Sequence, residues 1–139
     1  MIATAIPEAT VIPIDFSSSN LHPSIVVDTR SIHKVIGGYS SLLFGCGIGL
    51  SRQIGIMLED LLLSGIELPP VVLDADGLNL MSKVGNWWER LPSGALLTPH
   101  PGEMSTLTGE KISEIQSDRQ SLCRSVSYTH LTLPTTPYV

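Results

Sequence analysis

Three short apolar runs, none of them alternating with polar residues, constrain most strongly what this chain can fold into. They are Ser41–Phe44, Val71–Leu73 and Ala95–Thr98, and each leads directly into a turn of glycine or polar residues. Strands of this kind are typical of parallel sheets with helices on both faces. Ligands bind at the carboxyl ends of the strands in such sheets. The pattern therefore predicts an α/β fold whose functional site lies at these three turns.

Residue patterns typical of helices occur before, between and after the three apolar runs. A helix is expected over Thr29–Ile36, and another begins after Ser51, a good N-cap, and ends before Gly65. The remaining expected elements are a strand at Ala9–Ile14, a short helix at Asn86–Leu91, a helix from Pro101 to Gly109, and a helix that starts with a capping box of Ser113 and Gln116.

Length, charge and cysteine content narrow the class of protein. The 139 residues suffice for one domain, and the net charge of −5 gives no electrostatic reason to expect nucleic acid or an anionic membrane as partner. No apolar run approaches the roughly 20 residues of a membrane span. Cys46 and Cys123 lack metal-ligand spacing and are expected to be free thiols. These features predict a soluble cytoplasmic protein.

The segment after Arg124 differs in character from the rest. Residues 125–139 contain two prolines, many threonines and no charged side chain, and they continue no helical pattern. The segment resembles read-through into adapter or vector sequence. We therefore expect residues 1–124 to be a partial domain and 125–139 to be a non-native tail, in which His130 has no role. The alternative is a genuine terminal strand and loop.

The first two turns contain residues that suit ligand contact. Glycines at 45, 47 and 49 allow a close approach of backbone to ligand, although a plain tight turn is an equal alternative. The second turn carries Asp74, Asp76 and Asn79, which are more polar groups than a turn needs. Asp76 alone has two open interpretations, a helix cap or a ligand contact.

The third turn places His100 between two prolines, Pro99 and Pro101, directly after a strand. Proline fixes its own backbone and restricts the residue before it, so the imidazole has few directions in which to point. A histidine held in this way is a better candidate for ligand contact than an isolated one.

Together the three turns resemble one family, the ADP- or ATP-dependent NAD(P)H-hydrate dehydratases of the ribokinase-like superfamily. LDADGLNL is similar to the family's LDADALNLL, GCGIG is similar to GPGLG, and TPHPGEM is identical. Order and intervals also agree, so the resemblance covers roughly Ile6 to Gln120. It implies a ribokinase-like, mostly parallel sheet with helices on both faces, incomplete at both ends.

The resemblance also implies a repair reaction. Damaged NADH or NADPH carries a hydroxyl at C6 of the nicotinamide ring; the enzyme phosphorylates that oxygen, and the lone pair of the ring nitrogen expels phosphate. The implied cofactors are ADP or ATP with Mg²⁺, and the implied partners are NAD(P)H hydrate and the adenine nucleotide. Bacterial relatives usually use ADP and are often fused to an epimerase domain. The full-length protein is expected to be a homo-oligomer.

Residue roles carry over by the same resemblance. Gly47 and Gly49 are expected near the hydrate, and His100 in contact with it. Glu103 stands where the superfamily has a glutamate that organises magnesium and phosphate through water. No residue of the chain is expected to bind the metal directly. Three polar residues of the second turn are expected to position substrate or metal-bound water: Asp74, Asp76 and Asn79.

The sequence departs from the family in four places. Cys46 replaces a proline and Gly77 an alanine, and both changes are mild. The glycine-rich GxGD segment, whose aspartate should act as base, is absent, and Asp118 lies in a predicted helix and cannot replace it. The opening strand and its glycine turn are also missing. We therefore expect the 139 residues alone to be catalytically inactive.

Two other functions remain open. One is a small-molecule kinase of the same superfamily, such as a hydroxymethylpyrimidine kinase, although those kinases typically have an NxxE stretch where this chain has HPGE. The other is a non-catalytic nucleotide-binding module.

Overall fold

The computed structural model describes residue 10 and residues 29–129 of the chain. Apart from Thr10, the strand predicted at Ala9–Ile14 lies outside the described residues, as do Leu131 and Leu133 of the predicted tail. None of the helices in the described part is both long and apolar enough to pass through a membrane.

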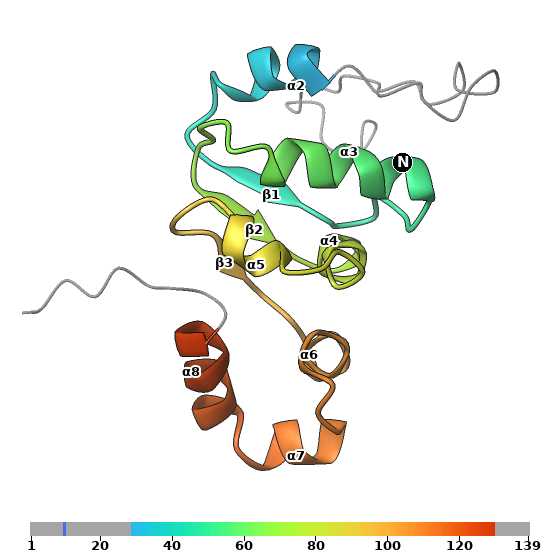
Figure 1. Cartoon of the computed structure of the whole chain (residues 1–139), viewed down its shortest axis with the longest axis vertical. Coiled ribbons are helices and arrows are strands. Elements are labelled where there is room, and N and C mark those ends of the chain that lie inside the picture. Colours follow the sequence, from blue (N-terminus) through green and yellow to red (C-terminus); the bar gives the residue numbers. More distant parts are fainter. Residues whose placement is uncertain (1–9, 11–28, 130–139) are drawn as a thin grey trace, which may run out of the picture.

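A parallel sheet of three short strands organises the described residues (Figure 1). The strands are β1 (Leu42–Phe44), β2 (Val71–Leu73) and β3 (Leu96–Leu97), in the order β1-β2-β3. Leu43 pairs with Val72, which in turn pairs with Leu96. The predicted α/β class and the predicted parallel pairing are therefore confirmed.

The described residues form seven helices. Ser51 accepts a hydrogen bond from the N–H of Ile54 at 3.3 Å, and Gly109 ends a later helix with a φ of 78°, so both predicted helix boundaries are confirmed. The helices are α2 (Thr29–Ile36), α3 (Arg52–Leu63), α4 (Asp76–Met81), α5 (Trp87–Arg90), α6 (Pro101–Thr108), α7 (Ile112–Ser117) and α8 (Arg119–Thr129).

The capping box predicted at Ser113 and Gln116 is wrong. Helix α7 begins at Ile112, two residues earlier than that box requires, so Ser113 lies inside the first turn. The carboxylate of Glu114 instead accepts the backbone N–H of Lys111 at 3.3 Å. The start of the helix is therefore capped by Lys111 and Glu114 and not by the serine.

Helix α8 continues past the boundary predicted at Ser125. It is started by Asp118, whose carboxylate accepts the N–H of Ser121 at 3.0 Å, and the hydrogen bonds from Ser121 lower the pKa of Asp118. The expectation that residues after Arg124 continue no helical pattern is wrong for residues 125–129, where no proline or glycine interrupts the chain. Ser125, Val126 and Ser127 are exposed or half-buried. The foreign origin of residues 125–139 stays a prediction.

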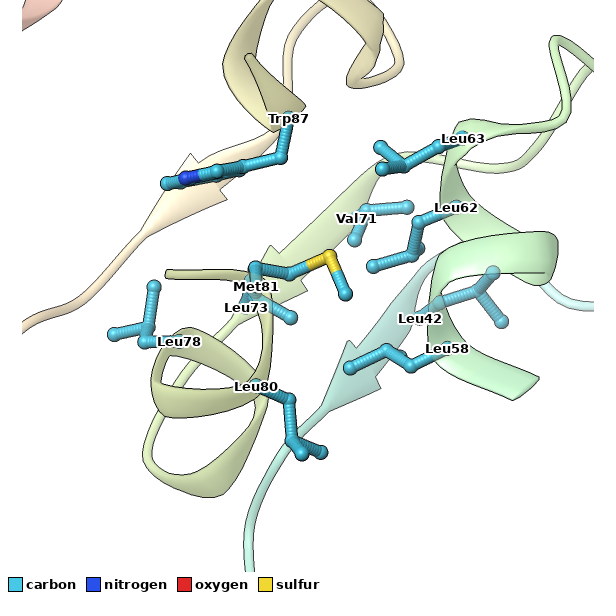
Figure 2. Close-up of a cluster of buried hydrophobic side chains, with 10 residues drawn as sticks. All are labelled: Leu42, Leu58, Leu62, Leu63, Val71, Leu73, Leu78, Leu80, Met81 and Trp87. Atoms are coloured by element: carbon cyan, nitrogen blue, oxygen red, sulfur yellow. The ribbon is translucent and has the colours of Figure 1, made fainter. Parts of the chain in front are cut away.

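The hydrophobic core lies between one face of the sheet and the helices α3, α4 and α5. Figure 2 shows leucines of α3 and the side chains of α4 converging on the side chain of Leu73 in β2. Leu58, Leu73 and Met81 are completely buried, and Trp87 is almost so. Burial of these side chains removes apolar surface from water and supplies the main force that holds the helices on the sheet.

The opposite face of the sheet is uncovered over the described residues. Leu43 and Leu96 are 61% and 57% exposed, and Val72 lies between them in register. In the described part of the chain, the helices that pack on the sheet place their buried side chains against the face that carries Leu42, Val71 and Leu73.

Two leucines on opposite faces of the sheet give a matched test of this arrangement. Leu73→Ala should lower the free energy of unfolding by about 2 to 5 kcal/mol, because it leaves a cavity in the core. Leu43→Ala should change it by no more than about 0.5 kcal/mol, because that side chain is already in water. Urea denaturation followed by circular dichroism measures both, and equal losses would show that the second face is covered.

Candidate functional site

The candidate site is built from the three turns that follow the three strands. The glycine turn (Gly45–Gly49) follows β1, the aspartate turn (Asp74–Gly77) follows β2, and the histidine turn (Thr98–Glu103) follows β3. Because the strands are parallel, their carboxyl ends lie along one edge of the sheet. The predicted location of all three turns on one edge is therefore confirmed.

The glycine turn needs glycine for two different reasons. Gly45, Gly47 and Gly49 have φ angles of 124°, 71° and 81°, which side chains of L residues rarely permit. A Cβ on Gly45 would lie 1.7 Å from the backbone oxygen of Asp74, so this glycine allows two chain segments to touch. A Cβ on Gly47 would meet nothing within 4 Å. The turn is thus packed on one side and open at Gly47.

The aspartate turn has an unusual backbone at its second residue. The carbonyl of Asp74 accepts the N–H of Gly77 at 3.0 Å, which closes a tight turn. Between them Ala75 has φ 48° and ψ −123°, a conformation that alanine rarely adopts. The carboxylate of Asp74 accepts the N–H of Ala75 at 2.8 Å. An ordinary alanine in the sequence gives no signal of this strain.

Asp76 connects the aspartate turn to the glycine turn. Its Oδ2 accepts a hydrogen bond from the backbone N–H of Gly49 at 2.9 Å. Asp76 is the first residue of α4, and the N-cap position before it belongs to Ala75, with no side-chain cap bond. The interpretation of Asp76 as a helix cap is therefore wrong.

Asn79 and Cys46 complete these two turns. The side-chain amide of Asn79 donates to the carbonyl oxygen of Ala75 at 3.2 Å, so it supports the strained backbone from within α4. The thiol of Cys46 is exposed and donates to Oδ2 of Asp74 at 3.8 Å. Both side chains are thus engaged within the turns.

The replacement of alanine by Gly77 has a local reason in this structure. A Cβ at this position would lie 2.7 Å from Cδ1 of Leu73 and 3.1 Å from Cα of Gly45. The glycine therefore lets the aspartate turn lie closer to the glycine turn than an alanine would without movement of Leu73.

The histidine turn is held by a reciprocal cap at the start of α6. Nδ1 of His100 accepts the N–H groups of Gly102 and Glu103, at 3.0 and 3.3 Å. Oε2 of Glu103 accepts the N–H of His100 at 2.8 Å, and Oε1 lies 3.1 Å from Nε2 of His100. Since Nδ1 accepts, the proton of the neutral ring is assigned to Nε2, the nitrogen that faces Glu103. The side chain of His100 is 67% exposed, whereas the side chain of Glu103 is only 8% exposed.

Of the seven predicted site residues, the structure joins Gly49 directly to Asp76 and His100 directly to Glu103, and it links Asp74 to the glycine turn through Cys46. Gly49, Asp74, Asp76 and the turn around Gly47 meet at the ends of β1 and β2. Within residues 29–129 no hydrogen bond joins the histidine turn to either of the other turns. The histidine turn is connected to the sheet by the N–H of Thr98, which donates to the carbonyl of Leu73 at 3.2 Å.

The described part of the chain contains no set of side chains that could bind a metal ion directly. No group of three or more histidine, cysteine, aspartate or glutamate side chains is placed there to hold an ion. Both carboxylate oxygens of Glu103 are engaged by His100, and the side chain is buried. Any metal-bound water at Glu103 would therefore have to share a carboxylate oxygen with the contacts to His100.

Comparisons with known proteins identify relatives. The family model of the NAD(P)H-hydrate dehydratases matches residues 1–131. The ADP-dependent (S)-NAD(P)H-hydrate dehydratase of Neisseria meningitidis is 33% identical over 107 residues, which are 75% of this chain and 36% of that protein. Bifunctional NAD(P)H-hydrate repair enzymes of Thermofilum pendens and Moorella thermoacetica are 36% and 40% identical, over 54% and 52% of this chain and 14% of each enzyme. The chain therefore spans about a third of the length of the Neisseria protein.

The two kinds of glycine in the first turn predict different costs of substitution. Gly45→Ala should lower the free energy of unfolding by on the order of 3 kcal/mol, because the new Cβ overlaps backbone that cannot rotate away. Gly47→Ala should cost only about 1 to 2 kcal/mol, because it meets no atoms and is penalised by its positive φ alone. Urea denaturation measures both losses, and a Gly47→Ala loss as large as that of Gly45→Ala would contradict the packing described here.

Proposed function

The chain belongs to the NAD(P)H-hydrate dehydratase family, and from this membership we propose that the protein dehydrates (6S)-NAD(P)H hydrate to NAD(P)H with the help of an adenine nucleotide. The match covers 36% of the Neisseria relative, so the complete reaction is proposed for the whole protein. The observation that carries the proposal is the pair of bonded turns at the ends of β1 and β2, open at Gly47.

The geometry supports a division of roles among the site residues. We propose that the hydrate approaches the glycine turn at Gly47, where no atom lies within 4 Å of a Cβ position. Gly49 contributes by shaping the turn, since its N–H is already bound to Asp76. His100 offers an exposed ring to the same ligand, and Asp74 and Asn79 hold the aspartate turn.

The nucleotide is proposed to be ADP, because the Neisseria relative is named as ADP-dependent. For Mg²⁺ the described residues offer no group of three or more candidate side-chain ligands, and Glu103 is buried against His100. We propose that the ion binds the nucleotide phosphates and keeps several water molecules as its other ligands, as Mg²⁺ commonly does. The sequence contains no GxGD segment, and no residue of it is assigned as the base. We further propose that the protein acts in the cytoplasm as a homo-oligomer.

Cys46 provides a direct test of hydrate binding. This exposed thiol lies in the glycine turn, next to Gly47, whereas the second exposed thiol, Cys123, lies on α8. Bound (6S)-NADPH hydrate should slow the alkylation of Cys46 by iodoacetamide at least about threefold and leave Cys123 unchanged, because a ligand over the turn blocks access to it. Peptide mass spectrometry measures both rates in the same sample.

Unmodified NADPH is the control for this experiment, since it differs from the hydrate only at the nicotinamide ring. Absence of protection at millimolar hydrate, or equal slowing at Cys123, would contradict the proposed site. Protection by nucleotide alone, with none by hydrate, would favour the non-catalytic nucleotide-binding module instead.

A pair of substitutions tests the role of His100. His100→Ala should raise the hydrate concentration for half-protection of Cys46 by about tenfold, because a ring contact to the ligand is lost. His100→Asn is the matched variant: asparagine is a good N-cap and keeps α6 capped, but it lacks the imidazole. If the asparagine variant binds hydrate as the wild type does, His100 is a helix cap and not a ligand contact.

A further inference from the structure

We propose that Asp76 is a positioning residue for NAD(P)H hydrate, which acts by holding the glycine turn in the shape that the ligand meets. This inference rests on the proposed function. Its central observation is the 2.9 Å hydrogen bond from the N–H of Gly49 to Oδ2 of Asp76, formed between residues 27 positions apart. Hydrogen bonds from N–H groups to carboxylates are about twice as strong as those between neutral groups.

The glycine turn depends on support from outside itself. Its own backbone bond, from the N–H of Ile48 to the carbonyl of Gly45, measures 3.5 Å and is therefore weak. Three of its five residues are glycine, which has more conformational freedom to lose than any other residue. A turn of this composition takes its shape from contacts with its neighbours, and the Asp76 carboxylate is the one charged group that bonds its backbone in the described residues.

The aspartate turn is built in a way that directs Asp76 toward this task. The rare backbone conformation of Ala75, together with the bond from Gly77 to Asp74, turns the chain sharply just before α4. A carboxylate at the start of a helix would ordinarily bond the free N–H groups of that helix. Here α4 has no such side-chain bond, and the carboxylate reaches across to the glycine turn.

The position of Gly47 connects this hydrogen bond to the ligand. Gly47 is the open residue of the turn and lies two positions from Gly49. Because the N–H of Gly49 is bound to Asp76, release of that bond would free the segment that presents Gly47. Asp76 therefore influences hydrate affinity by holding the turn. It does not touch the ligand, and its negative charge does not act on the ligand.

Backbone amide exchange tests the first half of this inference without any ligand. In Asp76→Ala the N–H of Gly49 should exchange about tenfold faster than in the wild type, because its acceptor is gone. Asp76→Asn should remain within about twofold, since the amide oxygen can still accept. Amides of β2 should be unchanged in both variants, which separates local release from general loss of stability. An unchanged Gly49 exchange rate in Asp76→Ala would overturn the proposal.

Hydrate affinity, measured by protection of Cys46, tests the second half. Asp76→Ala should raise the half-protection concentration about tenfold, and Asp76→Asn should restore it to within about twofold of the wild type. Glu67→Ala is the control: it removes an exposed carboxylate from the loop before β2, at the other end of that strand, and should have no effect.

The outcomes separate this inference from the function on which it rests. Equal losses in the alanine and asparagine variants would mean that the charge itself acts on the ligand, and would overturn the positioning role. Unchanged affinity in Asp76→Ala, with a protected wild type, would do the same and leave the proposed function intact. A wild-type chain that hydrate does not protect would overturn the proposed function, and with it the ligand half of this inference.

Discussion

The close approach of the chain at the ends of β1 and β2 is the constraint on which the candidate site depends. The carbonyl of Phe44 accepts the N–H of Asp74 at 2.9 Å, and the next residue, Gly45, has no room for a Cβ against the backbone of Asp74. Gly77 meets the same contact from the other side. The core beneath, centred on the buried Leu73, fixes the two strands that carry these turns. Everything that distinguishes the site from an ordinary pair of βα turns follows from this contact.

The site combines two turns that depend on each other with one that stabilises itself. The glycine and aspartate turns are joined by the hydrogen bond between Asp76 and Gly49, so a substitution in one turn affects the energy of the other. The histidine turn instead satisfies its own polar groups through the reciprocal cap of His100 and Glu103. Its position relative to the other turns is set by the sheet and by the packing of α6 beside α4. A ligand that spans all three turns would therefore meet two independently held surfaces.

Elements with a strong local signal could be predicted from the sequence. The three parallel strands follow from continuous apolar runs, and the start of α3 at Ser51 follows from its cap. The box at Ser113 and the break in helical pattern after Arg124 were predicted wrongly, because local spacing and a change in composition do not by themselves determine where helices begin and end.

Partners across the fold could not be predicted, even where the residues themselves were singled out. An aspartate at the start of a helical run has the sequence signature of a cap, and only the tertiary approach of the glycine turn gives Asp76 a different partner. The strain at Ala75 is invisible for the same reason, since alanine is imposed on that conformation by its neighbours. The sequence pattern and the family resemblance single out three turns that lie at one edge of the sheet, but the pairing within them is a property of the folded chain.

The pairing of Glu103 with His100 changes how the chemistry of the third turn should be interpreted. By resemblance, Glu103 organises magnesium and phosphate, yet here one of its oxygens accepts the backbone N–H of His100 and the other faces the ring. In the neutral ring Nδ1 accepts from α6, so the proton lies on Nε2, which faces the carboxylate at 3.1 Å. Replacement of Glu103 by glutamine would keep one acceptor and set an N–H group against the ring proton. Any effect of that change on phosphoryl transfer would therefore include a reoriented His100, and the two residues are best regarded as one unit in this family member.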